Sequence, residues 1–335
     1  MQIIELKPNA KILVIQLRRI GDVLLTTPVV RALRRKFTNA RIDFLVEKPG
    51  AELLAGNPYI NNLLIYNKKE QWQWLGKIRA AKYDLILDYL GNPRTAWIVG
   101  LSGAKYRLGF QRPGRDFVYS IKIKPDPAPK YVPAHKLDLL KPLGIIANNT
   151  SLDLTVSFPA KERVRNFLAK EKIAANDMLV GISPTSRRPA RRWLKQGFAE
   201  IADLLMEKYQ AKVVFLWGPG EETYIDDIIN LMKKRPLKAP ALNIAESIAL
   251  TSALKLFIGN DNGPMHIAQG LGIPSVVIFG PTQSANWNEP GPNNITVKAD
   301  VTCLECNKQE CADLSCMERI TVSMVEEAIK KVVSL

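Results

Sequence analysis

Residues 256–268 read LFIGNDNGPMHIA, and residues 272–282 read GIPSVVIFGPT. The pattern predicts a buried strand, a polar turn, a short helix and a second buried strand, which together form the crossover unit of a parallel sheet. Pro264 suits the first turn of a helix, because its missing N–H would have no partner there. Gly263 lets a ligand approach the backbone closely, and the free amides at a helix start favour a phosphate.

Two polar side chains of this stretch are candidates for a ligand site. Asp261 stands where the first strand ends, at the edge where open α/β sheets bind ligands. His266 is expected on the first turn of the helix, within reach of the same ligand. The two residues also fit a purely structural turn, with a capping aspartate and a packed histidine, and their spacing leaves both interpretations open.

Length and composition predict a globular protein. A chain of 335 residues is long enough for two domains with their own cores, and 47% hydrophobic and 24% charged residues are ordinary values. No apolar run approaches the roughly 20 residues that cross a bilayer. The N-terminus lacks the charged-then-apolar order of a signal peptide. We therefore expect a cytoplasmic protein.

The net charge of +15 is concentrated in the first half of the chain. Residues 1–150 hold 25 of the 47 lysines and arginines but 11 of the 32 aspartates and glutamates, which leaves +14 there and +1 in the remainder. A field of one sign attracts nucleic acid, an anionic membrane surface or an acidic substrate. We expect the first half to bind such a partner.

Apolar runs alternate with helical segments along most of the chain. Strands are expected at 11–16, 41–46, 62–66, 83–88, 105–108, 178–183 and 211–217. A first helix is expected to end near residue 36, and further helices are expected at 71–81, 95–102, 161–172, 194–209, 221–233, 245–253 and 322–335. This alternation predicts doubly wound parallel sheets covered on both faces. The Pro-rich, basic stretches 106–115 and 122–133 are expected to be irregular surface loops, and 148–159 is expected to link two domains.

Three motifs together resemble a known family. Residues 19–28 read RIGDVLLTTP, residues 259–266 read GNDNGPMH and residues 279–282 read FGPT. Their order and spacing resemble glycosyltransferase family 9, the bacterial lipopolysaccharide heptosyltransferases and their relatives, and the resemblance runs almost end to end. It implies an α/β GT-B fold of two Rossmann-like domains facing a central cleft. Residues 1–157 would bind the acceptor and 158–335 the nucleotide-sugar, and the final helix could pack back toward the first domain.

The resemblance also implies a reaction. The family transfers heptose from ADP-heptose to an anionic, lipid-linked inner-core saccharide at the cytoplasmic face of the inner membrane, with inversion and without a metal or other cofactor for catalysis. An acidic acceptor agrees with the positive first half. Asp22 matches the family's general base, which takes the proton of the attacking hydroxyl. Taken alone, Gly21-Asp22 at a strand-to-helix turn also fits a helix cap. For the donor, another nucleotide-sugar is the alternative.

The resemblance assigns the donor site to the second half. The matching residues are Thr185, Ser186, Arg191, Glu221, Asp261, Asn262, Gly263 and His266. Oriented amides and a cation would stabilise the charge that develops on the leaving diphosphate. The chain departs from the family at Asn262, where Thr or Ser is usual, and at Arg191, where Lys is usual; an arginine grips a diphosphate with a different geometry. Glu222 competes with Glu221 for the contact with the nucleotide ribose.

Basic residues of the first half are candidates for contacts with acceptor carboxylates and phosphates. They are Arg18, Lys68, Lys69, Arg107, Arg112 and Arg115. Each of them also fits an ordinary solvated surface charge. Trp72 and Trp74 fit sugar stacking, a membrane interface or a half-buried helix.

Four cysteines lie close together near the C-terminus. Cys303, Cys306, Cys311 and Cys316 follow the spacing C-x2-C-x4-C-x4-C, which is that of a zinc knuckle with its histidine replaced. A structural zinc and reduced packing thiols both fit this pattern. Neither interpretation places the cysteines at the chemistry.

Two functions of other classes are less well supported. An NAD-dependent oxidoreductase needs G-x-G-x-x-G after the first strand, and residues 17–22 contain Gly21 alone. A nucleic-acid-binding protein would account for the basic half and the knuckle spacing. It would leave Asp22 and residues 261–266 without a role, so we expect no nucleic-acid partner.

Overall fold

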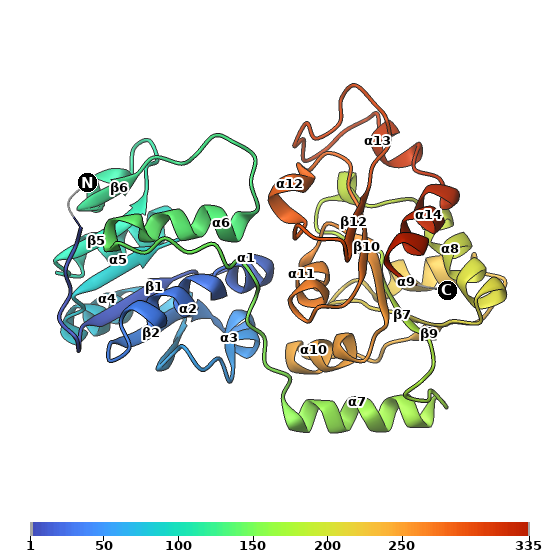
Figure 1. Ribbon diagram of the computed structural model, residues 1–335, viewed down its shortest axis with the longest axis horizontal. Coiled ribbons are helices and arrows are strands. Elements are labelled where there is room, and N and C mark those ends of the chain that lie inside the picture. The colour runs from blue at the N-terminus through green and yellow to red at the C-terminus, as the bar shows by residue number, and fades with distance from the viewer. Residues whose placement is uncertain (1–2, 334–335) are drawn as a thin grey trace. The chain divides into compact units, whose positions relative to one another are not determined.

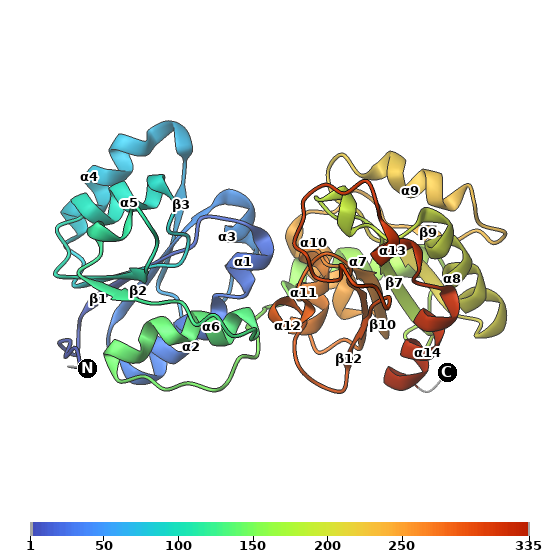
Figure 2. The ribbon, with the colours of Figure 1, turned by 90° about the horizontal axis from the view of Figure 1, so that it is seen from above.

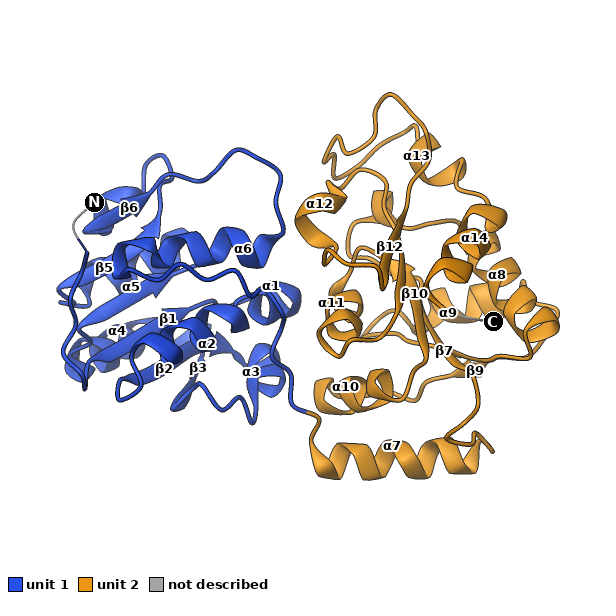
Figure 3. Cartoon of the chain, in the orientation of Figure 1, with its two compact units in different colours: residues 1–155 blue, residues 156–335 orange. Residues whose placement is uncertain are grey.

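The computed structural model describes residues 3–333, and the chain divides into two compact units between Thr155 and Val156 (Figure 3). Within the described residues, each unit is built on one six-stranded sheet in which all neighbouring strands are parallel. No helix in residues 3–333 has the length and apolar character needed to cross a membrane. The two doubly wound parallel sheets predicted from the sequence are thus confirmed.

Unit 1 alternates strands with helices. Its elements are β1 (Lys11–Ile15), α1 (Ile20–Leu24), α2 (Thr27–Lys36), β2 (Arg41–Glu47), α3 (Lys48–Leu54), β3 (Asn62–Tyr66), η1 (Lys68–Glu70), α4 (Gln71–Ala81), β4 (Leu85–Asp88), α5 (Pro93–Leu101), β5 (Tyr106–Phe110), η2 (Asp116–Val118), β6 (Ile121–Ile123), α6 (Val132–Leu137) and η3 (Asp138–Leu143). The strand order is β3-β2-β1-β4-β5-β6. Helices α4 and α5 cover one face of the sheet, and α2 and α6 cover the other (Figure 2).

Unit 2 repeats this architecture. Its elements are α7 (Phe158–Lys170), β7 (Leu179–Ser183), η4 (Pro189–Arg191), α8 (Lys195–Lys208), β8 (Lys212–Phe215), α9 (Glu222–Ile229), β9 (Leu237–Lys238), α10 (Ile244–Ser252), β10 (Leu256–Asn260), α11 (Gly263–Gly270), β11 (Ser275–Ile278), α12 (Ser284–Trp287), β12 (Asn294–Val297), α13 (Ser315–Glu318) and α14 (Val322–Val332) (Figure 1). The strand order is β12-β11-β10-β7-β8-β9, which is the order of unit 1 read from the opposite edge.

Both faces of the unit 2 sheet are buried. Val180 and Ile182 of β7 pack into a core with α8, α9 and α14, whereas Leu179 packs into a second core with α7, α10 and α11. Neighbouring residues of a strand point to opposite faces, so a strand covered on both sides is apolar along most of its length. The last helix, α14, packs on the sheet of its own unit through Val325 and Ile329.

Three strands of the structure have no counterpart in the sequence analysis. They are β6, β9 and β12, and each lies at the edge of its sheet. These three edge strands have two to four residues and are half-exposed, so they lack the continuous apolar run that marks a central strand. The prediction of irregular loops at 106–115 and 122–133 was wrong in part, because β5 covers Tyr106–Phe110, β6 extends to Ile123 and α6 begins at Val132.

The order in which the chain adds strands reverses once in each sheet. In unit 1 the chain moves outward from β1 to β3 and then returns to add β4 on the other side of β1, and in unit 2 β7 and β10 are related in the same way. The connections that follow these two strands leave in opposite directions, and ligands of open α/β sheets bind at that point. The segments after β1, β4, β7 and β10 are therefore the places to look for a site.

A close contact supports the end of β4. The Tyr119 hydroxyl donates to the Asp88 carboxylate Oδ2 at 2.9 Å, and the other oxygen of Asp88 accepts the N–H groups of Leu90 and Gly91, each at 3.0 Å. The Tyr119 ring lies against Gly109 of β5, where a Cβ would come within 2.3 Å of it. The absence of a side chain at Gly109 lets Tyr119 reach Asp88.

We predict that Gly109→Ala lowers the free energy of unfolding by about 1–3 kcal/mol, because the new methyl group must displace the buried Tyr119 ring. The matched control is Gly76→Ala in α4, where no atom lies within 4 Å of the new Cβ. We expect that change to raise the free energy of unfolding by up to about 1 kcal/mol. Urea denaturation followed by circular dichroism measures both, and equal midpoints would contradict the packing of Tyr119.

Candidate active site

Asp22 lies in α1, the short helix that follows β1. Its carboxylate Oδ2 accepts a hydrogen bond from the backbone N–H of Arg19 at 3.3 Å, so the side chain caps its own helix. Asp22 also lines a cavity of about 500 Å³ within unit 1. The capping interpretation and the catalytic interpretation are therefore compatible at this residue.

The cavity beside Asp22 is formed by the carboxyl ends of central strands and by α6. Among its lining residues are Gln16, Tyr89, Phe110, Arg112, His135 and Lys136. These side chains come from distant parts of the sequence and meet because parallel strands end at the same edge of the sheet. Their mixture of aromatic, amide and cationic groups suits a polar ligand that carries negative charge.

Lys136 of α6 is buried directly beside the Asp22 turn. Its Nζ donates to Gln16 Oε1 at 3.0 Å, to the carbonyl oxygen of Asp22 at 2.8 Å and to Thr26 Oγ1 at 2.7 Å. Burial lowers the pKa of Lys136 to about 8, although the charge of Asp22 opposes this shift. Lys136 therefore holds the turn that carries Asp22 and places a titratable cation next to that carboxylate.

Lys136 was not found from the sequence, although the sequence contains a signal for it. Pro133, Leu137 and Leu140 are buried at helical spacing, and Lys136 falls within that apolar row. Lysine is almost never fully buried unless its charge has a partner. A lysine on the apolar face of a helix therefore indicates a buried polar contact.

His135 also faces the cavity and was not selected from the sequence. Its ring stacks on Phe110 with the centroids 4.7 Å apart and the planes 7° from parallel. Burial, followed by the charge of Lys130, lowers the pKa of His135 below its usual value. The neutral imidazole is therefore favoured near pH 7, and it can donate or accept a hydrogen bond.

The structure separates the six basic residues proposed for the acceptor. Arg112 lines the cavity with Asp22, whereas Arg107 and Arg115 line a different, apolar cavity beside α5. The Arg107 guanidinium donates to two backbone carbonyls of its own neighbourhood, at 2.7 and 2.8 Å. Arg18 lies in the turn before Asp22, and η1 contains the exposed Lys68 and Lys69.

The two tryptophans of α4 differ in environment. Trp74 is buried in the core of unit 1, and its ring lies 6.1 Å from that of Tyr66. Trp72 is 78% exposed. The interpretation as a half-buried helix therefore holds for Trp74 and not for Trp72.

In unit 2, the Asn262 side chain stabilises the turn that follows β10 through hydrogen bonds at both ends of its amide. Its Oδ1 accepts the Met265 N–H at 3.0 Å and so caps α11. Its Nδ2 donates to Ser183 Oγ at 2.9 Å and to the carbonyl oxygen of Thr185 at 2.8 Å, which ties the end of β10 to the end of β7. The asparagine that departs from the family pattern thus uses both ends of its amide within the protein.

Arg191 and Asp261 form an ion pair at the same edge of the sheet. Arg191 Nη1 lies 2.6 Å from Asp261 Oδ2, and the two side chains are 17% and 6% exposed. Ser186 Oγ donates to the carbonyl oxygen of Asp261 at 3.1 Å. Three residues from η4, from the end of β7 and from the end of β10 are thereby brought together, as the resemblance implied.

The geometry distinguishes Glu221 from Glu222. Glu221 Oε2 accepts hydrogen bonds from the Thr185 hydroxyl and the Gly218 N–H, each at 2.8 Å. The carboxylate of Glu221 therefore reaches the segment that follows β7, where Thr185 and Ser186 lie. Glu222 instead pairs with Lys238 Nζ at 3.1 Å. Glu221 is thus the better placed of the two carboxylates.

His266 completes the first turn of α11. It is 3% exposed, and its ring centroid lies 6.2 Å from that of Trp287 in α12. The helix start beside it begins at Gly263 and offers backbone N–H groups. Amides at a helix start are suited to a phosphate.

The four cysteines lie close together: burial and then the charges of Cys303, Cys306 and Cys311 raise the pKa of the Cys316 thiol. Cys303 and Cys306 are exposed, Cys311 is partly exposed and Cys316 is buried. Across residues 3–333, no group of three or more His, Cys, Asp or Glu side chains is placed to hold a metal ion.

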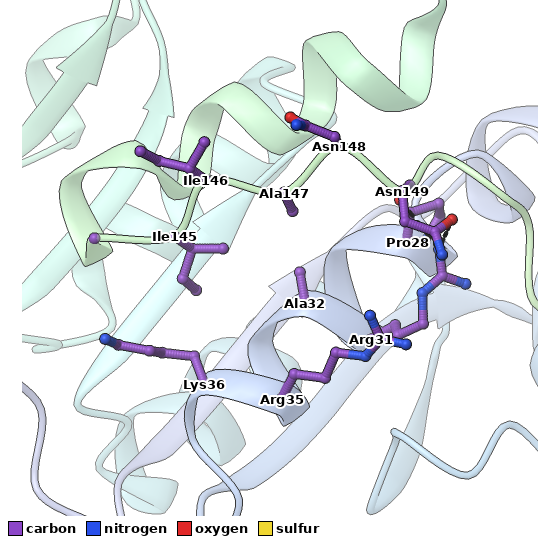
Figure 4. A pocket seen from close by; sticks show the side chains of 11 residues that line it. Pro28, Arg31, Ala32, Arg35, Lys36, Ile145, Ile146, Ala147, Asn148 and Asn149 are labelled. Carbon is purple, nitrogen blue, oxygen red and sulfur yellow. Dashed lines mark hydrogen bonds between the residues drawn. The ribbon is translucent and has the colours of Figure 1, made fainter.

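A further cavity of about 400 Å³ lies between α2 and residues 144–149 (Figure 4). Arg31 lines this cavity, and its guanidinium is bonded to other residues of unit 1. Its Nη1 lies 2.6 Å from Asp153 Oδ2, and its Nη2 donates to the Ser151 carbonyl oxygen at 2.7 Å. These contacts tie the end of unit 1 to α2. No site residue predicted from the sequence lines this cavity.

Known proteins resemble this chain in sequence and in fold. Lipopolysaccharide heptosyltransferase 3 of Escherichia coli is 30% identical to this chain over 293 residues, which cover 82% of this chain and 84% of that protein. A glycosyl transferase of family 9 from Veillonella parvula has the same fold, with a TM-score of 0.86 at 21% identity over 99% of both chains.

An E. coli heptosyltransferase solved with ADP-2-deoxy-2-fluoro heptose also shares the fold, with a TM-score of 0.73 at 16% identity over 96% of this chain and 100% of that one. Residues 72–317 of this chain match the profile of glycosyltransferase family 9 (heptosyltransferase). With that match and the 30% identity to the E. coli enzyme, this chain belongs to glycosyltransferase family 9, the heptosyltransferases.

Proposed function

We propose that this enzyme transfers heptose from ADP-heptose to an anionic, lipid-linked lipopolysaccharide inner-core acceptor at the cytoplasmic face of the inner membrane. The observation that carries the proposal is the placement of Asp22, at the end of β1 and on a cavity lined by cations. The names of the relatives support the substrate class, since one is a lipopolysaccharide heptosyltransferase and another was solved with an ADP-heptose analogue.

In the proposed reaction the acceptor hydroxyl attacks the anomeric carbon from the side opposite the diphosphate, which inverts that centre. Asp22 takes the hydroxyl proton as the new C–O bond forms. The bond from the anomeric carbon to the diphosphate oxygen breaks, and ADP leaves with the bonding electrons. Arg191 and the amides at the start of α11 offset the charge that develops on the diphosphate. The proposal includes no metal, in keeping with the resemblance.

The departures at Asn262 and Arg191 favour one alternative, a family 9 transferase that uses another nucleotide-sugar. Asn262 has no hydroxyl such as the usual Thr or Ser would offer, and its amide N–H groups already donate to Ser183 and Thr185. A panel of nucleotide-sugars, tested with truncated core acceptors, separates the two donors. Turnover with ADP-heptose at least tenfold above every other donor is the expected result.

We predict that Asp22→Asn lowers kcat by about 100- to 10,000-fold, because the amide cannot take up the hydroxyl proton. The variant retains an oxygen for the Arg19 N–H, so the fold and the affinity for ADP should change little. Coupled detection of released ADP measures kcat, and calorimetry measures ADP binding. Glu52→Gln, an exposed carboxylate of α3, is the matched control and should retain full turnover. Near-normal turnover in Asp22→Asn would remove the base assignment.

A second prediction concerns Arg191. Arg191→Met should lower kcat by about 100- to 1,000-fold, because it removes a cation from the leaving diphosphate. The change also leaves Asp261 buried without this partner, so Arg191→Lys is needed as a companion that keeps the charge. We expect Arg191→Lys to recover at least tenfold of the loss. Arg187→Met, an exposed arginine of the same loop, should behave like the native enzyme; an equal loss there would indicate a general effect of loop charge.

A third prediction uses the low pKa of Lys136. The side chain loses its proton as the pH rises through about 8, so the cation beside Asp22 disappears. We expect kcat/KM of the native enzyme to fall between about pH 7 and pH 9, and Lys136→Met to lack that fall while being about tenfold less active at pH 7. Lys141→Met, an exposed lysine of η3, should keep the native profile. An unchanged profile in Lys136→Met would show that Lys136 does not act through its charge.

A further inference from the structure

The outer side of α5 carries a row of apolar side chains. Ile98 and Val99 face the core of unit 1, whereas Pro93, Trp97 and Leu101 follow one another at four-residue spacing on the other side. Trp97 is 62% exposed and Leu101 39% exposed. Since burying such side chains is favourable, a contiguous exposed set of them marks an interaction site.

The turn η2 extends this apolar surface. Phe117 is 76% exposed, and its neighbour Val118 packs against α5 at Gly100, where a Cβ would lie 3.2 Å from a Val118 methyl group. Phe117, Trp97 and Leu101 line a shared cavity of about 390 Å³. The surface is therefore formed jointly by α5 and η2, and it has a hollow that can receive an apolar group.

The rim of this surface is positive. Arg107 and Arg115 line the same cavity. The acidic residue of η2, Asp116, lies 3.7 Å from Lys122 Nζ, so its charge is offset. A ligand that complements this surface must therefore combine apolar groups with negative charge.

We propose that the α5–η2 surface, consisting of Pro93, Trp97, Leu101 and Phe117 with Arg107 and Arg115 at its rim, docks on a bilayer that contains anionic lipids. Aromatic side chains bordered by arginines are typical of segments that sit at the membrane–water interface. Anionic headgroups attract the arginines, and the hollow can receive part of an acyl chain.

A second copy of the chain fits this surface less well. Residues 1–150 carry a net charge of +14, so a symmetric contact would bring two strongly positive surfaces together. The inference rests on the proposed function for one point only, which is that an enzyme with a lipid-linked acceptor works at a membrane. Binding to lipid can be measured without any transfer.

The test is cosedimentation of the full chain with vesicles of phosphatidylcholine alone and of phosphatidylcholine with phosphatidylglycerol. We expect at least tenfold tighter binding to the anionic vesicles, and at least a tenfold loss of that binding in the double variant Trp97→Ser/Phe117→Ser. Ile146→Ser is the matched control, because Ile146 is 88% exposed but lies beside α2 rather than α5. It should bind as the native protein does.

Three results would overturn the inference. They are native-like vesicle binding by the double variant, an equal loss in Ile146→Ser, and a dimer of the native protein in lipid-free solution that the double variant abolishes. The substituted side chains are exposed, so the double variant should keep its melting temperature. It should also keep full transfer to a water-soluble truncated acceptor, and this measurement distinguishes a failure of membrane docking from a failure of the proposed reaction.

Discussion

The polar side chains of the candidate site lie where central strands end, because both faces of each parallel sheet are covered by helices. In unit 2, Leu179, Val180 and Ile182 of β7 alternate between two separate cores, and the polar residue of this strand, Ser183, is its last one. Asp22 follows β1 and Asp261 follows β10, and each of these is one of the two central strands at which the chain order of its sheet reverses. The position of the candidate site is thus a consequence of burying the sheets.

Two polar side chains at these strand ends, Lys136 and Asn262, hold neighbouring segments together. Lys136 holds the Asp22 turn with three hydrogen bonds, and Asn262 ties the end of β7 to the end of β10. An unsatisfied polar group in such a place is costly, and a fully paired network makes the local structure rigid. Rigid placement of a carboxylate and of a cation is what the proposed transfer requires, since most of its catalysis comes from position and charge.

Four basic residues of the first half lie on two different surfaces of unit 1. Arg112 and Lys136 lie on the polar cavity beside Asp22, whereas Arg107 and Arg115 border the apolar cavity of α5. An acidic saccharide suits the first surface and an anionic bilayer suits the second, so one excess of charge can serve both the acceptor and the membrane that carries it.

The order of elements, the parallel sheets and the positions of Asp22 and Asp261 at strand ends could all be predicted from the sequence, because a strand buried on both faces must be a continuous apolar run and the turn that follows it must be polar. The family could be recognised because its motifs are local. The edge strands β6, β9 and β12, the hydrogen-bond partners of Lys136, the internal contacts of Asn262 and the separation of Arg112 from Arg115 were decided by the tertiary structure alone. Each of these depends on which side chains from distant segments meet after the sheets have formed, and no local pattern of residues records that meeting.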